Sequence, residues 1–374
     1  MAFNISAETS EFDNDTVEPD ANQPASVSLP DINLFFAVFL PLLSIATIVG
    51  NAGVMLAFLK VPALQEKPSD LLILNLSVTD FFLGWIMLIF MTPYFVSGMW
   101  PYGEIGCMIW AGSGNLLVSA SLYTLCAISW DRVLLVVKEY PSYVKLQSRT
   151  RIKVTIGLCW ILSLIPMTLE LSMWKRAKEN VFMASLINFN YICLSLPRLI
   201  KAFSLSGFFI FVLTPILMVT VLSAVFLYFL HLRLRKNRQV AIGGGSASAN
   251  ETTSHSAGNT ATSTVEGNGV SAKPNTNEPN SKSAKSHRFN KRYIKPAVTL
   301  AALVFAMAVC MLPYSIYVIL GTFCPTCVAN INSRLRYALL LLTYCNATLD
   351  PLLYSMTQSK IKGYYKSKLR NMCR

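Results

Sequence analysis

Two carboxylates in the sequence lie inside long apolar runs, where an unpaired charge is costly. Asp80 follows LLILNLSVT, and Asp350 follows LLLLTYCNATL. A carboxylate taken out of water needs a cation, a proton or hydrogen-bond donors to compensate it. Asn346 lies four residues before Asp350 and therefore on the same helix face. With Asn51 and Ser121, these residues either line a water-filled pocket that accepts a cation or hydrogen-bond neighbouring helices together.

We expect the cation of such a pocket to be sodium, bound by Asp80 and Ser121. The carboxylate would supply the charge, and the hydroxyl would supply a further oxygen ligand. Sodium would then act as an allosteric ion, and the sequence indicates no other cofactor.

An acid and a base stand side by side after a long uncharged stretch. None of the seventeen residues from Gly114 to Trp130 is charged, and Asp131 and Arg132 follow them directly. Taken alone, Arg132 could simply extend to the membrane surface beside a neighbour that neutralises it. The other possibility is that the pair has a role of its own at the end of the apolar segment.

The composition explains where these polar residues lie. Of the 374 residues, 53% are apolar or aromatic and 14% are charged. Seven apolar runs of about 20 to 25 residues can each cross a hydrocarbon core roughly 30 Å thick. The sequence thus predicts an all-α membrane protein, a bundle of seven transmembrane helices. The runs are centred near Ile45, Ile86, Tyr123, Ile161, Thr214, Val304 and Leu342.

The basic residues predict the orientation of the chain. If the amino terminus lies outside, 25 of the 32 Lys and Arg residues lie on the inner side, as the positive-inside rule requires. The net charge of +13 then faces anionic lipid and cytoplasmic partners, not nucleic acid. Residues 1–31 lack the features of a cleavable signal peptide, so we expect the first run to direct its own insertion into the plasma membrane.

Five segments are expected along the chain. Residues 1–31 hold seven acidic residues and no basic one, which predicts a disordered extracellular tail, glycosylated at Asn4 and Asn14. Residues 32–238 contain the first five transmembrane helices, and residues 287–357 contain the last two. Residues 239–286 form a disordered third cytoplasmic loop, flanked by basic extensions of the fifth and sixth helices. Residues 358–374 form an amphipathic surface helix and a tail, with apolar residues at Ile361, Tyr364, Tyr365 and Leu369.

The cysteines differ in the side of the membrane that they face. Cys107 starts the third run, Cys193 lies in the second outer loop, and Cys324 and Cys327 share the third outer loop. In an oxidising compartment two disulfides are the most economical pairing, and we expect one of them to tie the outer loop to the third helix. A zinc site at CPTC is the alternative, but no second ligand pair accompanies it. Cys373 has the position of a palmitoylation site or of a plain tail thiol.

The polar markers occur in a characteristic order, one on each helix. They resemble those of the rhodopsin-like (class A) G-protein-coupled receptors, and the resemblance covers all seven runs. The markers are GN at Gly50 and Asn51, LNLSVTD ending at Asp80, WPYG at Trp100–Gly103, Cys107, WDR at Trp130–Arg132, Trp160, Pro215, CMLPY at Cys310–Tyr314 and DPLLY at Asp350–Tyr354.

The resemblance implies a signalling role for the inner end of the bundle. Arg132 would engage a heterotrimeric G protein once the sixth helix moves outward, and Asp131 would hold it at rest. Asp350, Pro351 and Tyr354 would belong to the same switch. An extracellular ligand would drive the change, and arrestin, receptor kinases and membrane lipid would be further partners.

Within this family the sequence is most similar to the amine receptors, of the histamine and muscarinic kind. Those receptors place an Asp eighteen residues before the Arg of the third helix, where this chain has Gly114. Asn115 and Ser119 offer neutral hydrogen bonds instead. The loss of an ion pair weakens the assignment of an amine ligand. The chain also lacks the last-helix Lys of opsins, because Tyr344 takes its place.

A mostly apolar ligand pocket is therefore expected near the outer side. Each of its residues could equally serve ordinary helix packing. Glu170, at the outer end of the fourth run, is either an alternative counter-ion or a residue that reaches the interface or pairs with Lys175. The pocket residues are Gly114, Asn115, Val118, Ser119, Phe208, Phe211, Met311, Tyr314, Ser315 and Tyr344.

The inner end of the sixth helix lacks a residue that many relatives have. They place an acid twenty residues before the Pro of this helix, to pair with the Arg of the third helix. That position is Tyr293, and no carboxylate lies between Ser281 and Pro296. Met307 and Met311 stand where an aromatic residue is usual, and Met is more pliable. These features predict signalling without ligand.

Two alternatives remain at this point. A transporter or channel would also place polar residues at mid-membrane, but no internal repeat indicates one. An amine receptor with a non-standard amine site is the second alternative. An enzyme is not indicated, since the three His residues, His231, His255 and His287, all lie in or beside the third inner loop.

Overall fold

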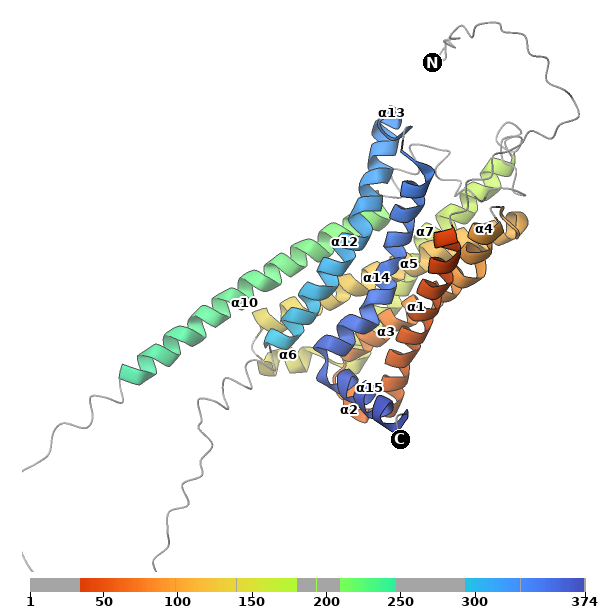
Figure 1. Ribbon diagram of the computed structural model, residues 1–374. Coiled ribbons are helices and arrows are strands. Elements are labelled where there is room, and N and C mark those ends of the chain that lie inside the picture. Colours follow the sequence, from red (N-terminus) through yellow and green to blue (C-terminus); the bar gives the residue numbers. More distant parts are fainter. Residues whose placement is uncertain are drawn as a thin grey trace, which may run out of the picture.

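The computed structural model describes residues 34–97, 99–138, 140–179, 193, 209–246, 293–329 and 331–372. Every regular element within these residues is helical. Long helices lie side by side in a bundle, and short helices lie at its two ends (Figure 1). The predicted all-α fold is confirmed. The residues beyond these ranges include Asn4, Asn14, Phe208 and Cys373, so the predictions for them lie outside the described part of the chain.

Seven helical segments form the bundle. In chain order they are α1 (Leu34–Lys60), α3 (Asp70–Ile86) continued by the π-helical η1 (Met87–Met91) and α4 (Thr92–Ser97), α5 (Gly103–Val137), α7 (Arg149–Glu179), the π-helical η3 (Phe209–Leu213) continued by α10 (Thr214–Ser246), α12 (Lys295–Phe323) and α14 (Ser333–Thr357). The short helices are α2 (Pro62–Gln65), α6 (Tyr140–Leu146), α13 (Pro325–Ala329) and α15 (Ser359–Met372).

Six of the seven segments are long and apolar enough to cross a membrane by themselves. The seventh, α14, has 25 residues and packs against α1 and α12. It is less apolar because it carries Asn346 and Asp350, whose side chains are buried inside the bundle and do not face lipid. Helices are the expected solution, since each satisfies its own backbone hydrogen bonds in a medium without water.

The fifth segment differs from its prediction at its carboxyl end. The described apolar span runs from Ile210 to Arg235 and contains the predicted centre, Thr214. The boundary expected between residues 238 and 239 lies inside the same helix, which continues to Ser246. Gln239 and Ala241 are good helix formers that extend α10 beyond Arg238, and the helix continues through the three glycines before it ends at Ser246. Figure 1 shows α10 extending well past the other helices.

The third segment, α5, is the centre of the bundle. In its most apolar stretch 72% of the residues are buried, compared with 22% in α7 and 28% in the fifth span. Helices α3, α7, α10 and α12 all pack against it. Asn75 joins α3 to both α5 and α7. Its Nδ2 donates to Thr124 Oγ1 of α5 at 2.8 Å, and its Oδ1 accepts from Trp160 Nε1 of α7 at 3.0 Å.

The last helix, α15, packs against the carboxyl-terminal part of α1. Ile361 is fully buried, and Tyr364 and Tyr365 pack against the same hydrophobic core. The Tyr365 hydroxyl donates to the Gly50 carbonyl of α1 at 3.3 Å. Three residues of the predicted apolar stripe thus contact protein, at the end of the bundle that also holds α2 (Figure 1), and the side chain of the fourth, Leu369, lies outside the described part of the chain.

Candidate functional site

The acid and base near the carboxyl end of α5 form a buried ion pair. Arg132 Nη1 lies 3.0 Å from Asp131 Oδ2, and both side chains are buried. Two residues from the connection after α5 hold the carboxylate: the Tyr143 hydroxyl donates to Asp131 at 3.2 Å, and Gln147 Nε2 donates to Oδ1. Burial raises the pKa of Tyr143, so the phenol keeps its proton and remains a donor.

This arrangement depends on local sequence. Tyr143 lies on the short helix α6, and Gln147 follows it directly, so one connection brings both donors to the same carboxylate. Buried ions are tolerated only when they are paired and hydrogen-bonded, which is the condition met here. The group that could leave this network and contact a partner is the Arg132 guanidinium, because Asp131 keeps two other donors.

A second cation, which the sequence did not single out, joins three helices nearby. Arg233 of α10 donates through Nη1 to the Tyr293 hydroxyl at 2.9 Å and through Nη2 to the Lys138 carbonyl at 2.7 Å. Its guanidinium carbon also lies 5.4 Å from the centre of the Tyr293 ring. Tyr293 is buried and stands at the position that lacks an acid. Arg233 therefore links these helices at the position where the sequence lacks an acid that could pair with Arg132.

The predicted polar core is assembled from four helices. Asn51 of α1, Asp80 of α3, Ser121 of α5, and Asn346 and Asp350 of α14 are all buried. Asn51 Nδ2 donates to the carbonyls of Thr47 and Ala347, at 2.9 and 3.0 Å, and so joins α1 to α14. The helices also approach closely here, since a Cβ on Gly50 would lie 3.1 Å from Pro351.

The carboxyl groups of this core face each other. Asp80 interacts with the Asp350 carboxyl and with the Ser121 hydroxyl. Two buried carboxylates in contact cannot both carry a full charge unless they share a proton or a cation. Five buried oxygens on these helices make no hydrogen bond to the described residues, and carboxylate, amide and hydroxyl oxygens are the ligands that a hard cation or water would bind. They are Asn51 Oδ1, Asp80 Oδ2, Asn346 Oδ1, Asp350 Oδ2 and the Tyr354 hydroxyl.

The described residues of the predicted ligand pocket come from four segments. Gly114, Asn115, Val118 and Ser119 lie on α5, Phe211 on η3, Met311, Tyr314 and Ser315 on α12, and Tyr344 on α14.

Val118 connects the two halves of this set. It packs against the core cluster that contains Met311 and also against the cluster that contains Tyr344. Ser119 and Ser315 are buried as well. At Gly114 a Cβ would meet no described atom within 4 Å, so the missing side chain leaves open space on this face of α5.

Glu170 does not reach the membrane interface. Its side chain, on α7, is only 3% exposed, and Asn115 Nδ2 of α5 lies 3.4 Å from its Oε2. The sequence left open whether this residue reaches the interface, pairs with Lys175 or acts as a counter-ion. Burial against α5 contradicts the first of these; the Lys175 side chain lies outside the described part of the chain.

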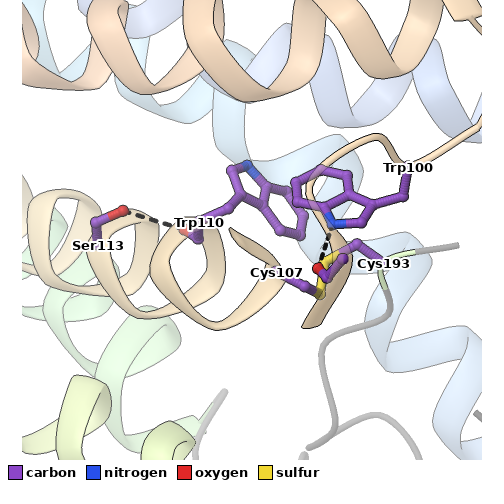
Figure 2. Close-up of a disulfide and its surroundings, with 6 residues drawn as sticks. Trp100, Cys107, Trp110, Ser113 and Cys193 are labelled. Atoms are coloured by element: carbon purple, nitrogen blue, oxygen red, sulfur yellow. Dashed lines mark hydrogen bonds between the residues drawn. A yellow bond between two sulfur atoms is a disulfide. The ribbon is translucent and has the colours of Figure 1, made fainter. Parts of the chain in front are cut away.

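Both expected disulfides form. Cys107 of α5 is joined to Cys193, with Cα atoms 5.6 Å apart. Figure 2 shows this bond beside two indole rings: Trp100, which donates to the Gly103 carbonyl at 2.8 Å, and Trp110, whose ring centre lies 5.7 Å from that of Trp100. Cys324 is joined to Cys327, so CPTC has no free thiolate for zinc.

Comparisons with known proteins agree with this geometry. Residues 50–354 match the family described as 7 transmembrane receptor (rhodopsin family). The 5-hydroxytryptamine receptor 1B of Equus caballus is 30% identical over 179 residues, which are 48% of this chain and 45% of the relative. The Histamine H4 receptor of Homo sapiens is 31% identical over 42% of this chain and 40% of the relative.

The matched stretches thus span about half the length of these relatives. A longer alignment is also found: the 5-hydroxytryptamine receptor 1B of Cricetulus griseus is 24% identical over 93% of this chain and 90% of the relative.

Proposed function

Because the chain belongs to the rhodopsin family of seven-transmembrane receptors, we propose that it is a G-protein-coupled receptor of the plasma membrane. Its amino terminus lies outside, an extracellular ligand binds in the outer half of the bundle, and a heterotrimeric G protein binds at the inner end. The observation that carries the proposal is the buried Asp131–Arg132 pair.

The pair suits a switch because it is stable and can still be released. Tyr143 and Gln147 continue to donate to Asp131 when Arg132 turns away, so the carboxylate keeps two hydrogen bonds. Ligand binding need only favour the released arrangement over the closed one to shift the population. Asp350, Pro351 and Tyr354, on α14 next to the polar core, would transmit the change from the outer half.

Nucleotide exchange on a heterotrimeric G protein tests the proposal. Membranes that contain the receptor should accelerate exchange, and Arg132→Ala membranes with equal receptor content should not. Ion and solute flux measured in vesicles separates a receptor from a transporter or channel. Flux without any Arg132-dependent exchange would overturn the proposal.

For the ligand, we propose an amine bound at a non-standard site. The relatives include receptors named for 5-hydroxytryptamine and histamine, so these two amines are the first probes. Gly114 replaces the usual Asp, and the charge of an amine must therefore be met elsewhere.

We also propose that the polar core binds sodium. The residues fit a hard cation, because two carboxyl groups, two amide oxygens and two hydroxyls, those of Ser121 and Tyr354, gather in one buried place. Asp80 would supply the charge, with Ser121 as a further ligand. The bound ion would offset one of the two facing carboxylate charges and so favour the arrangement in which α3, α5 and α14 stay together.

Further partners are proposed for the inner surface. Arrestin and receptor kinases would compete for the region around Arg132, and anionic lipid would meet the basic residues. Palmitoylation at Cys373 and glycosylation at Asn4 and Asn14 would add to the membrane attachment and to the outer tail.

A further inference from the structure

We propose that Asp70, a buried acid at the start of α3, is a second acceptor for the Arg132 guanidinium and, together with Asp131, holds it in the resting arrangement. The inference rests on the proposed receptor function and extends its switch from one helix to two.

The first observation is that the Asp70 side chain is buried without a direct partner. Asp70 is the first residue of α3 and is only 8% exposed. Among the residues that the structure describes, its carboxylate makes no hydrogen bond and no close ion pair. It is not needed to cap the helix either, because the first three amides of α3 donate to the carbonyls of residues 67–69, at 3.0 to 3.2 Å. Such a carboxylate is costly unless a nearby cation compensates it.

The second observation concerns the cations around this carboxylate. Three cations act on it, and the electrostatic attraction of Arg132 is the strongest. Lys67 is exposed, and Lys360 is partly exposed and lies 3.8 Å from the Glu66 carboxylate. Solvent screens the charges of both lysines, whereas the Arg132 side chain is buried. Arg132 is therefore the cation that can offset the burial of Asp70.

The third observation is a contact that brings two helices together at this point. Tyr143 of α6 donates to Asp131 at 3.2 Å. Its hydroxyl also interacts with that of Ser69, the buried residue before Asp70. The start of α3 and the carboxyl-terminal part of α5 are thus both tied to α6, next to the Arg132 guanidinium.

The two acids act on Arg132 in different ways. Asp131 lies next to it on α5, so their pairing does not link two helices. Asp70 lies on α3, so its attraction for the guanidinium acts across the interface between α3 and α5. When the guanidinium turns away, Asp131 keeps its two other hydrogen bonds, but Asp70 keeps only the screened attraction of the two lysines. The loss of this attraction opposes release and favours the resting arrangement.

Thermal unfolding of the purified full-length receptor measures the interaction in a double-variant cycle. Asp70→Asn keeps the shape of the side chain and removes its charge. In the unmodified receptor this change removes an attraction, and in an Arg132→Gln background it removes a buried charge that has lost its cation. The shift in unfolding temperature caused by Asp70→Asn should therefore be about 5 °C more positive in the Arg132→Gln background. Equal shifts would overturn the proposal, because an acid that serves only the start of α3 does not depend on Arg132.

Glu66→Gln is the matched control for this cycle. It removes the same charge four residues earlier, from a side chain that is 72% exposed, and its shift should be the same in both backgrounds. Lys67→Gln and Lys360→Gln backgrounds test the other two cations. A larger change of the Asp70→Asn shift in either of these backgrounds than in Arg132→Gln would overturn the proposal.

The distance between α6 and α12 tests the effect on the resting arrangement. Spin labels attached at Lys145→Cys of α6 and Lys295→Cys of α12, both exposed positions, report this distance in a Cys373→Ser background. Asp70→Asn should increase the ratio of long to short distances about tenfold. Glu66→Gln should leave this ratio unchanged.

An unchanged ratio in Asp70→Asn would show that Asp70 has a purely structural role and would overturn the proposal. Neither measurement uses nucleotide exchange, so failure of the proposed coupling to a G protein would not alter these outcomes.

Discussion

Arg233 of α10 holds the hydroxyl of Tyr293 at 2.9 Å and, with its other nitrogen, the carbonyl of Lys138 at 2.7 Å. One side chain thus joins the start of α12 to the end of α5. An arginine is suited to this, because its planar fork donates in two directions at once. The sequence predicted signalling without ligand from the lack of an acid at Tyr293, and this contact defines how to test it.

Tyr293→Glu should reduce ligand-independent nucleotide exchange. A carboxylate at this position would accept a charge-assisted hydrogen bond, which contributes about 1 kcal/mol more than a neutral one and changes a two-state population about fivefold. Tyr293→Phe, which removes the hydroxyl and keeps the ring, should increase exchange. Arg132→Ala membranes provide the baseline.

The double variant Arg233→Ala with Tyr293→Glu identifies which arginine the new carboxylate uses. If Arg233 is the partner, the reduction in exchange should disappear; if Arg132 is the partner, it should persist. No exchange above the Arg132→Ala baseline in the unmodified receptor would show that the Asp131–Arg132 pair and helix packing suffice to hold it at rest.

Cys107→Ser and Cys193→Ser should each abolish most surface expression. Their disulfide joins residues 86 positions apart, and in the chain-entropy account closing a loop of that length contributes about 4.5 kcal/mol. Cys324→Ser is the matched control, because its partner is three positions away and the contribution is only about 1.5 kcal/mol. Normal trafficking of both Cys107→Ser and Cys193→Ser would contradict the prediction.

Asp80→Ala should remove any dependence of signalling on sodium, since it deletes a carboxyl group that faces Asp350 and Ser121. Asp80→Asn should do the same while it preserves volume, and Ser121→Ala should weaken the dependence. Nucleotide exchange measured in sodium and in a bulky organic cation at equal ionic strength gives the comparison. A sodium response that survives in Asp80→Ala would exclude this carboxylate as the ligand.

Gly53→Ala should loosen α15. An added Cβ would lie 2.5 Å from the Tyr365 hydroxyl, so the phenol must move and lose its bond to Gly50, at about 1 kcal/mol. Gly157→Ala is the control, because its Cβ meets no described atom and alanine favours the helix by up to about 1 kcal/mol. The unfolding temperature should therefore rise in Gly157→Ala and not in Gly53→Ala.

A second variant separates the crowding of Tyr365 from the gain in helix propensity that alanine brings. Tyr365→Phe in the Gly53→Ala background removes the crowded hydroxyl and should restore part of the stability. An equal rise in unfolding temperature in Gly53→Ala and Gly157→Ala would mean that α15 accommodates the added methyl group with no loss of stability.

The bundle could be predicted from the sequence because length and apolarity alone define a membrane span. The pairing of Cys324 with Cys327 was equally accessible, since the two residues are close in the chain. Arg233 was not recognised, because a basic residue after a span has the same pattern whether it faces lipid or bonds to Tyr293, sixty residues further on.

Glu170 illustrates a second limit. The apolar span that contains it has no distinct polar face, so periodicity does not tell which face contacts protein. Its burial depends on where α5 lies, and that follows only from the packing of the whole bundle. The end of α10 was missed for a related reason: a polar, glycine-rich composition predicts where a core cannot form and does not state at which residue a helix stops.

The central place of α5 has a consequence for how the chain can vary. Nearly three quarters of its apolar stretch is buried, while most of the corresponding stretch of α7 is not. A saturation mutagenesis library selected for surface display should thus be depleted of variants along all faces of α5 and along only one face of α7. The lipid-facing positions of α7 would form a reservoir of neutral diversity, from which new contacts with other membrane proteins could arise without disturbing the receptor itself.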